Sequence, residues 1–265
     1  MGTRLYQASD IGFKYETEWI LRGITFQIEE GEFLGLIGPN GSGKTTLLKL
    51  LSRLLSPREG TITFKGRSLD SWNHRELARE VGVVPQETNI VYPLSVLEMV
   101  LMGRAPYASL LGFDKTGDIR IAEEMLNRVG LSHISDRPVS TISGGERQMV
   151  FIARALAQQA GLLLLDEPTA YLDIAHQVSI HGLLRRLNAE SGLTIITVSH
   201  DLNLASQYCS RLILLSRGEI HVQGRPDEVI TSDNIKGVYG CSPLVDRHPV
   251  TGTPRITLVP EEQIT

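Results

Sequence analysis

Eight residues near the start of the chain carry the clearest chemistry. The run Gly38 to Thr45 reads GPNGSGKT and matches the P-loop pattern G-x-x-x-x-G-K-[ST]. In this pattern, backbone N–H groups of a glycine-rich turn and of the following helix start bind phosphates. Lys44 would face the β and γ phosphates, and the hydroxyl of Thr45 suits Mg²⁺. The expected binding residues are Gly38, Pro39, Asn40, Gly41, Ser42, Gly43, Lys44, Thr45 and Thr46.

Two adjacent carboxylates follow an apolar run later in the chain. Four leucines at 162–165 precede Asp166 and Glu167. A buried strand that ends in acids delivers them to the carboxyl edge of a sheet, where α/β proteins bind ligands. There Asp166 could hold Mg²⁺ and Glu167 could polarise an attacking water. The alternative is an acidic helix N-cap, which these residue types also favour.

A second phosphate-binding helix start is predicted at Ser143, Gly144 and Gly145. These residues precede a strongly helical stretch at 147–159, with Ser143 as the expected N-cap and exposed backbone amides behind it. A single chain that binds one nucleotide needs only one such phosphate-binding helix start, which we call a phosphate cradle.

Hydrophobic patterning predicts the elements that hold these residues. The first thirty residues alternate weakly, as antiparallel strands do, and the run 32–37 is apolar enough for a strand buried on both faces. Leucines at helical spacing predict a helix over 45–55, and residues 88–160 show helical periods without a clear strand. Further buried strands at 81–84, 162–165, 194–198 and 212–215, with helices at 175–190 and 202–209, form βαβ units.

Composition excludes several classes of protein. The chain has 265 residues, 42% of them hydrophobic, and a net charge of −4, which is typical of a globular protein. The longest basic run is Arg185-Arg186, so no nucleic-acid partner is expected. No apolar run is long enough to span a membrane, and the first residues lack the layout of a signal peptide, so a soluble chain is expected.

The order of these motifs resembles the ATP-binding subunits of ABC transporters. The P-loop is followed by ISGGERQ at 142–148, by LLLLDEPT at 162–169 and by a strand that leads to His200, and the similarity covers residues 3–224. In that family, ATP lies between the P-loop of one subunit and the signature sequence of the other. The resemblance therefore implies a homodimer, with ATP and Mg²⁺ as cofactors, and accounts for the second cradle.

The same resemblance implies roles for four further residues. Tyr15 corresponds to the aromatic residue that stacks on adenine, and Gln86 to the glutamine that touches Mg²⁺ and the membrane partner. Asp173 corresponds to the aspartate that crosses to the other subunit, and His200 to the switch residue on the γ phosphate. Other readings remain open: Tyr15 as core packing, Gln86 as a loop residue and His200 as a helix cap.

These roles define the expected site. The catalytic set is Lys44, Gln86, Glu167 and His200, and the Mg²⁺ ligands are Thr45, Gln86 and Asp166. The chain departs from the family pattern at Ile142, Glu146 and Tyr171. His176 and His181 do not share a helical face in the manner of metal ligands, and we expect both to be solvated.

Stretches outside the motifs are similar to the ATPases of importers for iron-siderophore complexes, haem and vitamin B12. The similarity lies in HRELAREVGVVPQET, VLMGRAPY, LDIAHQ, SHDLNLA and the tail VYGCSPLVDRHPVTGTP. It implies separate integral membrane permease subunits, an indirect link to a substrate-binding protein, and a peripheral location on the cytoplasmic face of the inner membrane. The alternatives are another class of ABC importer or exporter, and a non-transport ABC ATPase, whose long coiled coil this chain lacks.

The expected fold is an α/β P-loop NTPase. It combines a mostly parallel central sheet with an antiparallel N-terminal β subdomain and an inserted helical subdomain. The nucleotide-binding core, of the RecA-like type, is expected at 1–87 and 161–224, the helical signature subdomain at 88–160, and a C-terminal extension at 225–265.

Overall fold

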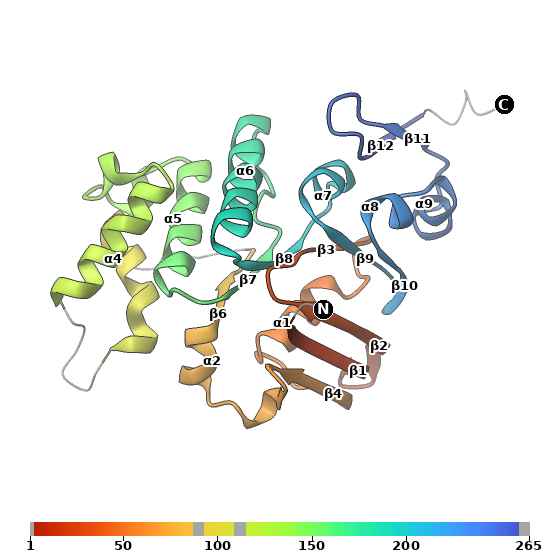
Figure 1. The fold of residues 1–265 in the computed structure, drawn as a ribbon, viewed down its shortest axis with the longest axis horizontal. Helices are drawn as coiled ribbons and strands as arrows, with labels where there is room; N and C mark the ends of the chain where they lie inside the picture. The colour runs from red at the N-terminus through yellow and green to blue at the C-terminus, as the bar shows by residue number, and fades with distance from the viewer. Residues whose placement is uncertain (1–2, 87–92, 109–114, 260–265) are drawn as a thin grey trace. The chain divides into compact units, whose positions relative to one another are not determined.

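The computed structural model describes residues 3–86, 93–108 and 115–259. Contacts divide the chain into two compact units, of which one comprises residues 1–71 and 188–265 and the other residues 72–187. Figure 1 shows the helices and strands of both units.

The first unit begins with an antiparallel sheet, as predicted. Its strands β1 (Arg4–Tyr15), β2 (Glu18–Glu29), β4 (Glu59–Phe64) and β5 (Arg67–Ser68) pair in the order β2-β1-β4-β5. The phenol of Tyr6 donates a 2.6 Å hydrogen bond to the carbonyl of Leu51. Complete burial raises the pKa of Tyr6, so this side chain stays protonated and fixes the sheet against the following helix.

The same unit contains buried parallel strands. Strand β3 (Phe33–Ile37) pairs in parallel with β8 (Thr194–Val198) and with β9 (Arg211–Ser216), and β10 (Glu219–Gly224) adds antiparallel to β9. All five residues of β3 are buried, as the apolar run predicted. Leu36 pairs with Val198 and Ile37 with Leu214. The loops that leave these strands therefore start at one edge of the sheet.

Helix α1 (Lys44–Leu51) follows β3 and ends four residues before the predicted end at Leu55. Ser52 is its C-cap, Arg53 has a left-handed φ of 58°, and Leu54 is 68% exposed. The backbone N–H groups of Leu54 and Leu55 both turn back to the carbonyl of Lys49. The leucine spacing continues beyond the last turn of the helix, so the apolar periodicity alone could not locate the helix end.

The tail of the first unit is more regular than predicted. Beyond helix α7 (Leu202–Tyr208), it contains α8 (Pro226–Val229), α9 (Ser232–Tyr239) and a hairpin of β11 (Leu244–Arg247) and β12 (Pro254–Thr257). The sequence itself indicates only a short helix at 227–231, followed by Pro and Gly at irregular intervals.

The second unit contains two parallel strands and a group of helices. Strands β6 (Val81–Val84) and β7 (Leu162–Asp166) pair so that Val84 lies opposite Leu165. Helices α3 (Val96–Leu101), α4 (Lys115–Arg128) and α5 (Gly144–Ala157) pack on one another (Figure 1). The unit also contains α2 (His74–Glu80), the 3₁₀ helix η2 (Met102–Tyr107) and α6 (Ile174–Ser191). The domain boundaries expected from the sequence stay a prediction.

A buried ion pair joins the helices of this unit. The guanidinium of Arg104 lies 2.8 Å from the carboxylate of Asp118, and both side chains are only 7% exposed. Arg104 also donates to the carbonyl of Ala157, 2.9 Å away. Because a buried charge is tolerated only when it is paired and hydrogen-bonded, this arrangement fixes η2 against α4 and α5.

Helix starts in the second unit are capped by side chains. Helices α2, α3 and α5 each begin with a reciprocal capping box, formed by Asn73 with Glu76, Ser95 with Glu98 and Ser143 with Glu146. Across the described ranges, no helix is long and apolar enough to cross a membrane.

The capping box of α3 predicts an acid-dependent loss of stability. Hydrogen bonds from the backbone N–H and the hydroxyl of Ser95 hold the pKa of Glu98 below its ordinary value of 4.5. A carboxyl whose pKa is lowered by folding stabilises the protein above its unfolded pKa, and that stabilisation is lost as pH falls through the folded pKa. We expect the unfolding free energy, measured with urea between pH 6 and 3 (roughly the carboxyl range), to fall less steeply in Glu98→Gln than in the wild type. Glu123→Gln, at an exposed position on α4, is the control, and equal slopes for all three proteins would contradict this role.

Candidate functional site

The loop from Gly38 to Gly43 joins β3 to α1 and adopts the compact conformation that its glycines allow. Gly38, Gly41 and Gly43 have φ values of 144°, 76° and 100°. An added Cβ would lie 2.2 Å from the carbonyl oxygen of Leu215 at Gly38, and 2.5 Å from a methyl of Leu21 at Gly43. At Gly41 an added Cβ would meet nothing within 4 Å. Close backbone packing therefore explains two of these glycines, and positive φ all three.

Helix α1 begins without a side-chain cap. Its N-cap is Gly43, and no acidic residue lies in its first turn, in contrast to the capping boxes of the second unit. The first backbone N–H groups and the positive end of the helix dipole therefore favour an external anion. Ser42 is only 2% exposed, and its hydroxyl has no hydrogen-bond partner among the described residues. Because an unsatisfied buried hydroxyl costs about 1–3 kcal/mol, this loop fits a bound phosphate.

Lys44 lies within the same loop. Its ammonium group donates to the carbonyls of Gly38 and Pro39, each 2.9 Å away, and the residue is 5% exposed. The positive charge is therefore held over the loop where the sequence predicts phosphates. Thr45 and Thr46 follow in the first turn of α1.

His200 lies at the same edge of the sheet as the P-loop. Ser199, which follows β8, donates its backbone N–H to the carbonyl of Leu36, 3.1 Å away. His200 comes next and is exposed. The alternative of a helix cap is wrong, because the N-cap of α7 is Asp201, whose carboxylate accepts from the N–H of Leu204.

Tyr15 is not a core residue. It is 47% exposed at the end of β1, with its ring edge-on to Phe13 at 4.9 Å between centroids. The β1–β2 hairpin that carries it approaches the P-loop where Leu21 meets Gly43. The ring of Tyr15 is therefore partly open to solvent, as a stacking role requires.

Sequence reasoning missed the contact between the C-terminal extension and the P-loop. Burial raises the pKa of Tyr239, the last residue of α9, to about 12, and the nearby backbone N–H of Gly38 acts against this rise. Strand β12 also bonds to α7: the amide of Asn203 pairs with the backbone N–H and carbonyl of Ile256 at 2.7 and 3.1 Å. No local pattern announces either contact, since each joins residues far apart in the sequence.

The second unit brings Gln86 and the two carboxylates together. Asp166 is the last residue of β7 and is 5% exposed. Since Val84 pairs with Leu165, Gln86 and Glu167 leave neighbouring strands at the same edge, and the amide of Gln86 donates a 2.7 Å hydrogen bond to the carboxylate of Glu167. Glu167 has a left-handed φ of 50°, and α6 begins only at Ile174, so the alternative of an acidic helix cap is wrong.

Ser143 is the N-cap of α5, as predicted, and forms a reciprocal capping box with Glu146. The hydroxyl of Ser143 accepts from the N–H of Glu146, while the Glu146 carboxylate accepts from the backbone N–H and the hydroxyl of Ser143, at 2.8 and 2.7 Å. These hydrogen bonds hold the pKa of Glu146 below its ordinary value. The second cradle therefore holds an internal carboxylate at the serine that would bind phosphate.

The two histidines that we expected to be solvated, His176 and His181, are both at least partly covered. His181 is 1% exposed, so the expectation is wrong there, because it lies on the inner face of α6. His176 is partly covered and lies 2.9 Å from both carboxylate oxygens of Asp173, through Nδ1. The hydrogen bond from the His176 N–H, followed by the one from its ring, lowers the pKa of Asp173. Tyr171, beside them, is 97% exposed with a φ of 62°.

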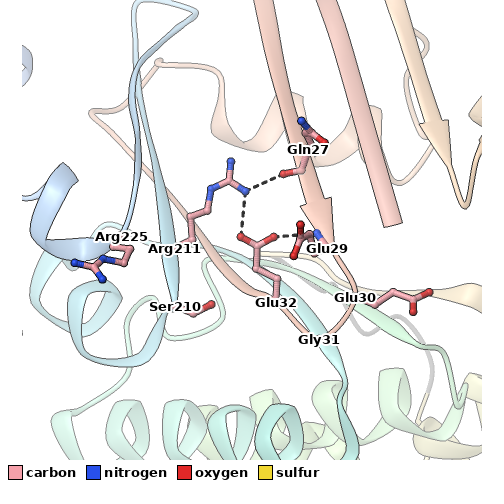
Figure 2. Close-up of a pocket in the computed structure, with 8 residues that line it drawn as sticks. All are labelled: Gln27, Glu29, Glu30, Gly31, Glu32, Ser210, Arg211 and Arg225. Atoms are coloured by element: carbon pink, nitrogen blue, oxygen red, sulfur yellow. Dashed lines mark hydrogen bonds and ion pairs between the residues drawn. The ribbon is translucent and has the colours of Figure 1, made fainter. Parts of the chain in front are cut away.

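A separate cavity of about 610 Å³ lies in the first unit, at the opposite ends of β3 and β9. Figure 2 shows Arg211 in this cavity, where it donates to the carbonyl of Gln27 and to Glu32, while Glu32 accepts from the N–H of Glu29. None of the predicted site residues lines it. We interpret this network as a junction between the antiparallel and parallel sheets of the first unit.

The architecture defines the class of protein. A phosphate-binding loop after a buried parallel strand, with a strand that ends in two acids, is typical of α/β P-loop ATPases. The sequence profile of the ABC transporter family matches residues 21–170, and this chain belongs to that family.

Individual relatives agree with this assignment. The chain is 39% identical over 237 residues to the ferric enterobactin transport ATP-binding protein of Escherichia coli (strain K12), a match that covers 89% of this chain and 88% of the relative. A solved structure described as a metal-chelate type ABC transporter in an inward-facing conformation superposes with a TM-score of 0.86, at 27% identity, and covers 98% of this chain and 99% of that one. A dimeric bacterial ABC transporter cassette superposes with a TM-score of 0.74, at 30% identity, and covers 83% and 98%.

Removal of the lysine charge should weaken nucleotide binding. We expect Lys44→Ala to lower ATP affinity at least about tenfold, the scale of a lost charge-assisted hydrogen bond. Isothermal titration calorimetry measures the effect. Lys49→Ala, in the last turn of the same helix, should bind ATP as the wild type does. Unchanged affinity in a folded Lys44→Ala protein would contradict the phosphate role.

Tyr15→Ala should weaken ATP and GTP alike, because stacking tolerates the identity of the base. Base stacking on an aromatic side chain contributes roughly 1–3 kcal/mol, which corresponds to about 5- to 150-fold in affinity. Tyr15→Phe keeps the ring and should stay close to the wild type in fluorescence titrations with labelled nucleotides. Equal affinities for all three proteins would exclude stacking.

Proposed function

We propose that this chain is the Mg²⁺-dependent ATP-hydrolysing subunit of an importer, and that ATP-driven closure of its homodimer powers uptake of a metal chelate through separate membrane permease subunits. The observation that carries the proposal is the presence of two helix starts suited to phosphate on one chain, at Gly43 and at Ser143. A nucleotide held by one P-loop can use only the second cradle of another copy.

This arrangement closes as a two-fold symmetric dimer. The same surface of each copy supplies its P-loop to one nucleotide and Ser143, Gly144 and Gly145 to the other, which makes the contact self-complementary. Without ATP, the P-loop of one copy and the helix start at Ser143 of the other would share no anion that holds them together. The dimer is therefore weak when empty, tight with ATP, and released after hydrolysis. The dimeric cassette among the structural relatives supports this assembly.

The donor atoms fit Mg²⁺. Thr45 offers a hydroxyl and Asp166 a carboxylate, and since the amide nitrogen of Gln86 donates to Glu167, its oxygen stays available. These are the hard oxygen ligands that Mg²⁺ takes, with substrate phosphates and water completing the shell. Among the residues that the structure describes, no group of three His, Cys, Asp or Glu side chains could hold a metal. When bound, Mg²⁺ would neutralise developing phosphate charge.

The residues of this chain have separate roles in binding and hydrolysis of ATP. Tyr15 holds the adenine, and Lys44 with the loop amides holds the β and γ phosphates. Glu167 accepts a proton from the attacking water, and the hydrogen bond from Gln86 fixes the orientation of its carboxylate. His200 contacts the γ phosphate from the neighbouring strand end, and Asp173 crosses to the second subunit.

The relatives support the substrate class. The transport of ferric enterobactin by the system of the Escherichia coli relative, and the metal-chelate type transporter among the solved structures, make a ferric-siderophore or similar chelate the proposed cargo. The cargo would pass through the permease, fed by a substrate-binding protein, while this chain docks near Gln86 on the cytoplasmic face of the inner membrane. Identification of the membrane proteins that copurify with the chain separates this proposal from another transporter class or a non-transport ATPase.

Glu167→Gln should separate binding from hydrolysis. We expect ATP binding to be retained and phosphate release to fall about a hundredfold or more, because the general base is lost. The variant should also form a stable dimer with ATP and Mg²⁺, measured by size-exclusion chromatography with light scattering. Glu190→Gln, at an exposed position on α6, is the control. Near-normal phosphate release would place the base elsewhere.

A second substitution tests the cradle. Gly144→Asp in the Glu167→Gln protein puts a carboxylate at the proposed γ-phosphate position, where an added Cβ has room, with its nearest neighbour, Leu172, 3.9 Å away. Aspartate also suits the first turn of a helix, so folding should be retained. The double variant should stay monomeric with ATP, and its dimerisation would contradict the sandwich arrangement.

A further inference from the structure

The imidazole of His176 lies between the turn before α6 and the start of α5, both in the second unit. On one side, its Nδ1 is 2.9 Å from both carboxylate oxygens of Asp173, and its backbone N–H donates to the same carboxylate. A carboxylate only accepts hydrogen bonds, so Nδ1 carries the hydrogen. The backbone N–H alone would cap the start of α6, so the ring adds a contact that capping does not require.

On its other side, the ring lies against Gly145, the second residue of α5. An added Cβ at Gly145 would fall 2.1 Å from Cδ2, 2.4 Å from Nε2 and 2.5 Å from Cγ of His176. Gly145 has no positive φ that would call for glycine. The close approach of the imidazole is therefore the reason that a side chain does not fit at this position.

Besides His176, the amide of Gln177 holds the turn before α6, since it donates to the carbonyl of Leu172, 3.1 Å away. Tyr171 and Ile174, on either side of Asp173, are 97% and 79% exposed. Leu172 is half-buried, and an added Cβ at Gly144 would be 3.9 Å from it, at ordinary contact distance. The ring of His176 thus adds a side-chain hydrogen bond to Asp173 and packs closely against the helix start at Gly145.

We propose that His176 is a positioning residue that holds Asp173 and the Ser143–Gly145 helix start in a fixed relation. The inference rests on the proposed function, in which these two segments reach the other subunit and its nucleotide. Held by one ring, the two segments approach a second copy as one rigid surface, and the closed dimer loses less conformational freedom on forming. The role is separate from the P-loop, which supplies ATP binding in the monomer.

The first test compares dimerisation with nucleotide binding. In the Glu167→Gln protein, His176→Ala should weaken the ATP-dependent dimer about tenfold, within the usual coupling between contacting residues. ATP affinity of the monomer should not change, and in the otherwise wild-type chain the turnover number should fall more than KM rises. His176→Asn, whose amide can still donate to Asp173, should recover part of the loss. His74→Ala, at an exposed position in the same unit, is the control.

A double-mutant cycle isolates the contact. Gly145→Ala should push the ring away from Asp173 and weaken the dimer as much as His176→Ala does. In the His176→Ala background the same substitution has room and should cost little further, so the effects should not add. Gly182→Ala, where an added Cβ meets nothing within 4 Å, is the matched glycine control. Additive losses, or a His176→Ala dimer as tight as its parent, would overturn the inference.

Amide hydrogen exchange on the nucleotide-free monomer tests whether His176 couples the Asp173 turn to the helix start at Gly145, without need of the dimer. His176→Ala should speed exchange in segments 143–148 and 170–176 together, while His74→Ala should change neither. A Glu167→Gln protein that fails to dimerise would count against the proposed function. The exchange experiment would still show whether His176 couples the two segments. Faster exchange in only one segment would show that the ring does not link the two.

Discussion

The hydrogen-bond register of the buried parallel strands determines where the chemistry of this chain can take place. In the first unit, Leu36 lies opposite Val198, and in the second, Val84 lies opposite Leu165. Within each unit, the residues that follow the pair leave the two strands at the same edge. In the first unit this brings the P-loop to the strand end before His200, and in the second it brings Gln86 to Glu167. A slip of one residue would reverse the faces of every side chain beyond it.

The two phosphate cradles differ in their resting electrostatics. Helix α1 starts with a glycine and no acid, so its amides favour an external anion, and Lys44 is bonded to carbonyls of its own loop. Helix α5 is closed by Glu146, which accepts both donors of Ser143. A phosphate that reaches Ser143 must take these hydrogen bonds from a carboxylate of the same charge sign. In the proposed dimer, a nucleotide fixed by the P-loop of the other copy would therefore compete with Glu146 for these donors.

Local patterns predicted most of the fold and the local parts of the site. The strands of both sheets, the P-loop turn and the cap at Ser143 all follow from short-range rules about apolar spacing, glycine and capping. The contacts of His176 with Gly145 and of Tyr239 with Gly38 do not follow from such rules, because they join segments that are distant in the sequence. Periodicity also extended α1 too far, and helical spacing did not show that His181 turns inward.

The proximity of Gly38 to Tyr239 has a consequence for the C-terminal extension at 225–265. It makes the C-terminal extension a structural neighbour of the first glycine in the phosphate loop, and β12 anchors that extension to α7. Coupling free energies are reciprocal. If phosphate binding changes this contact, the order of the tail and the affinity for nucleotide must change each other by the same factor. Truncation of the tail, or a protein that binds the tail, would then change the affinity for nucleotide without changing any residue of the P-loop.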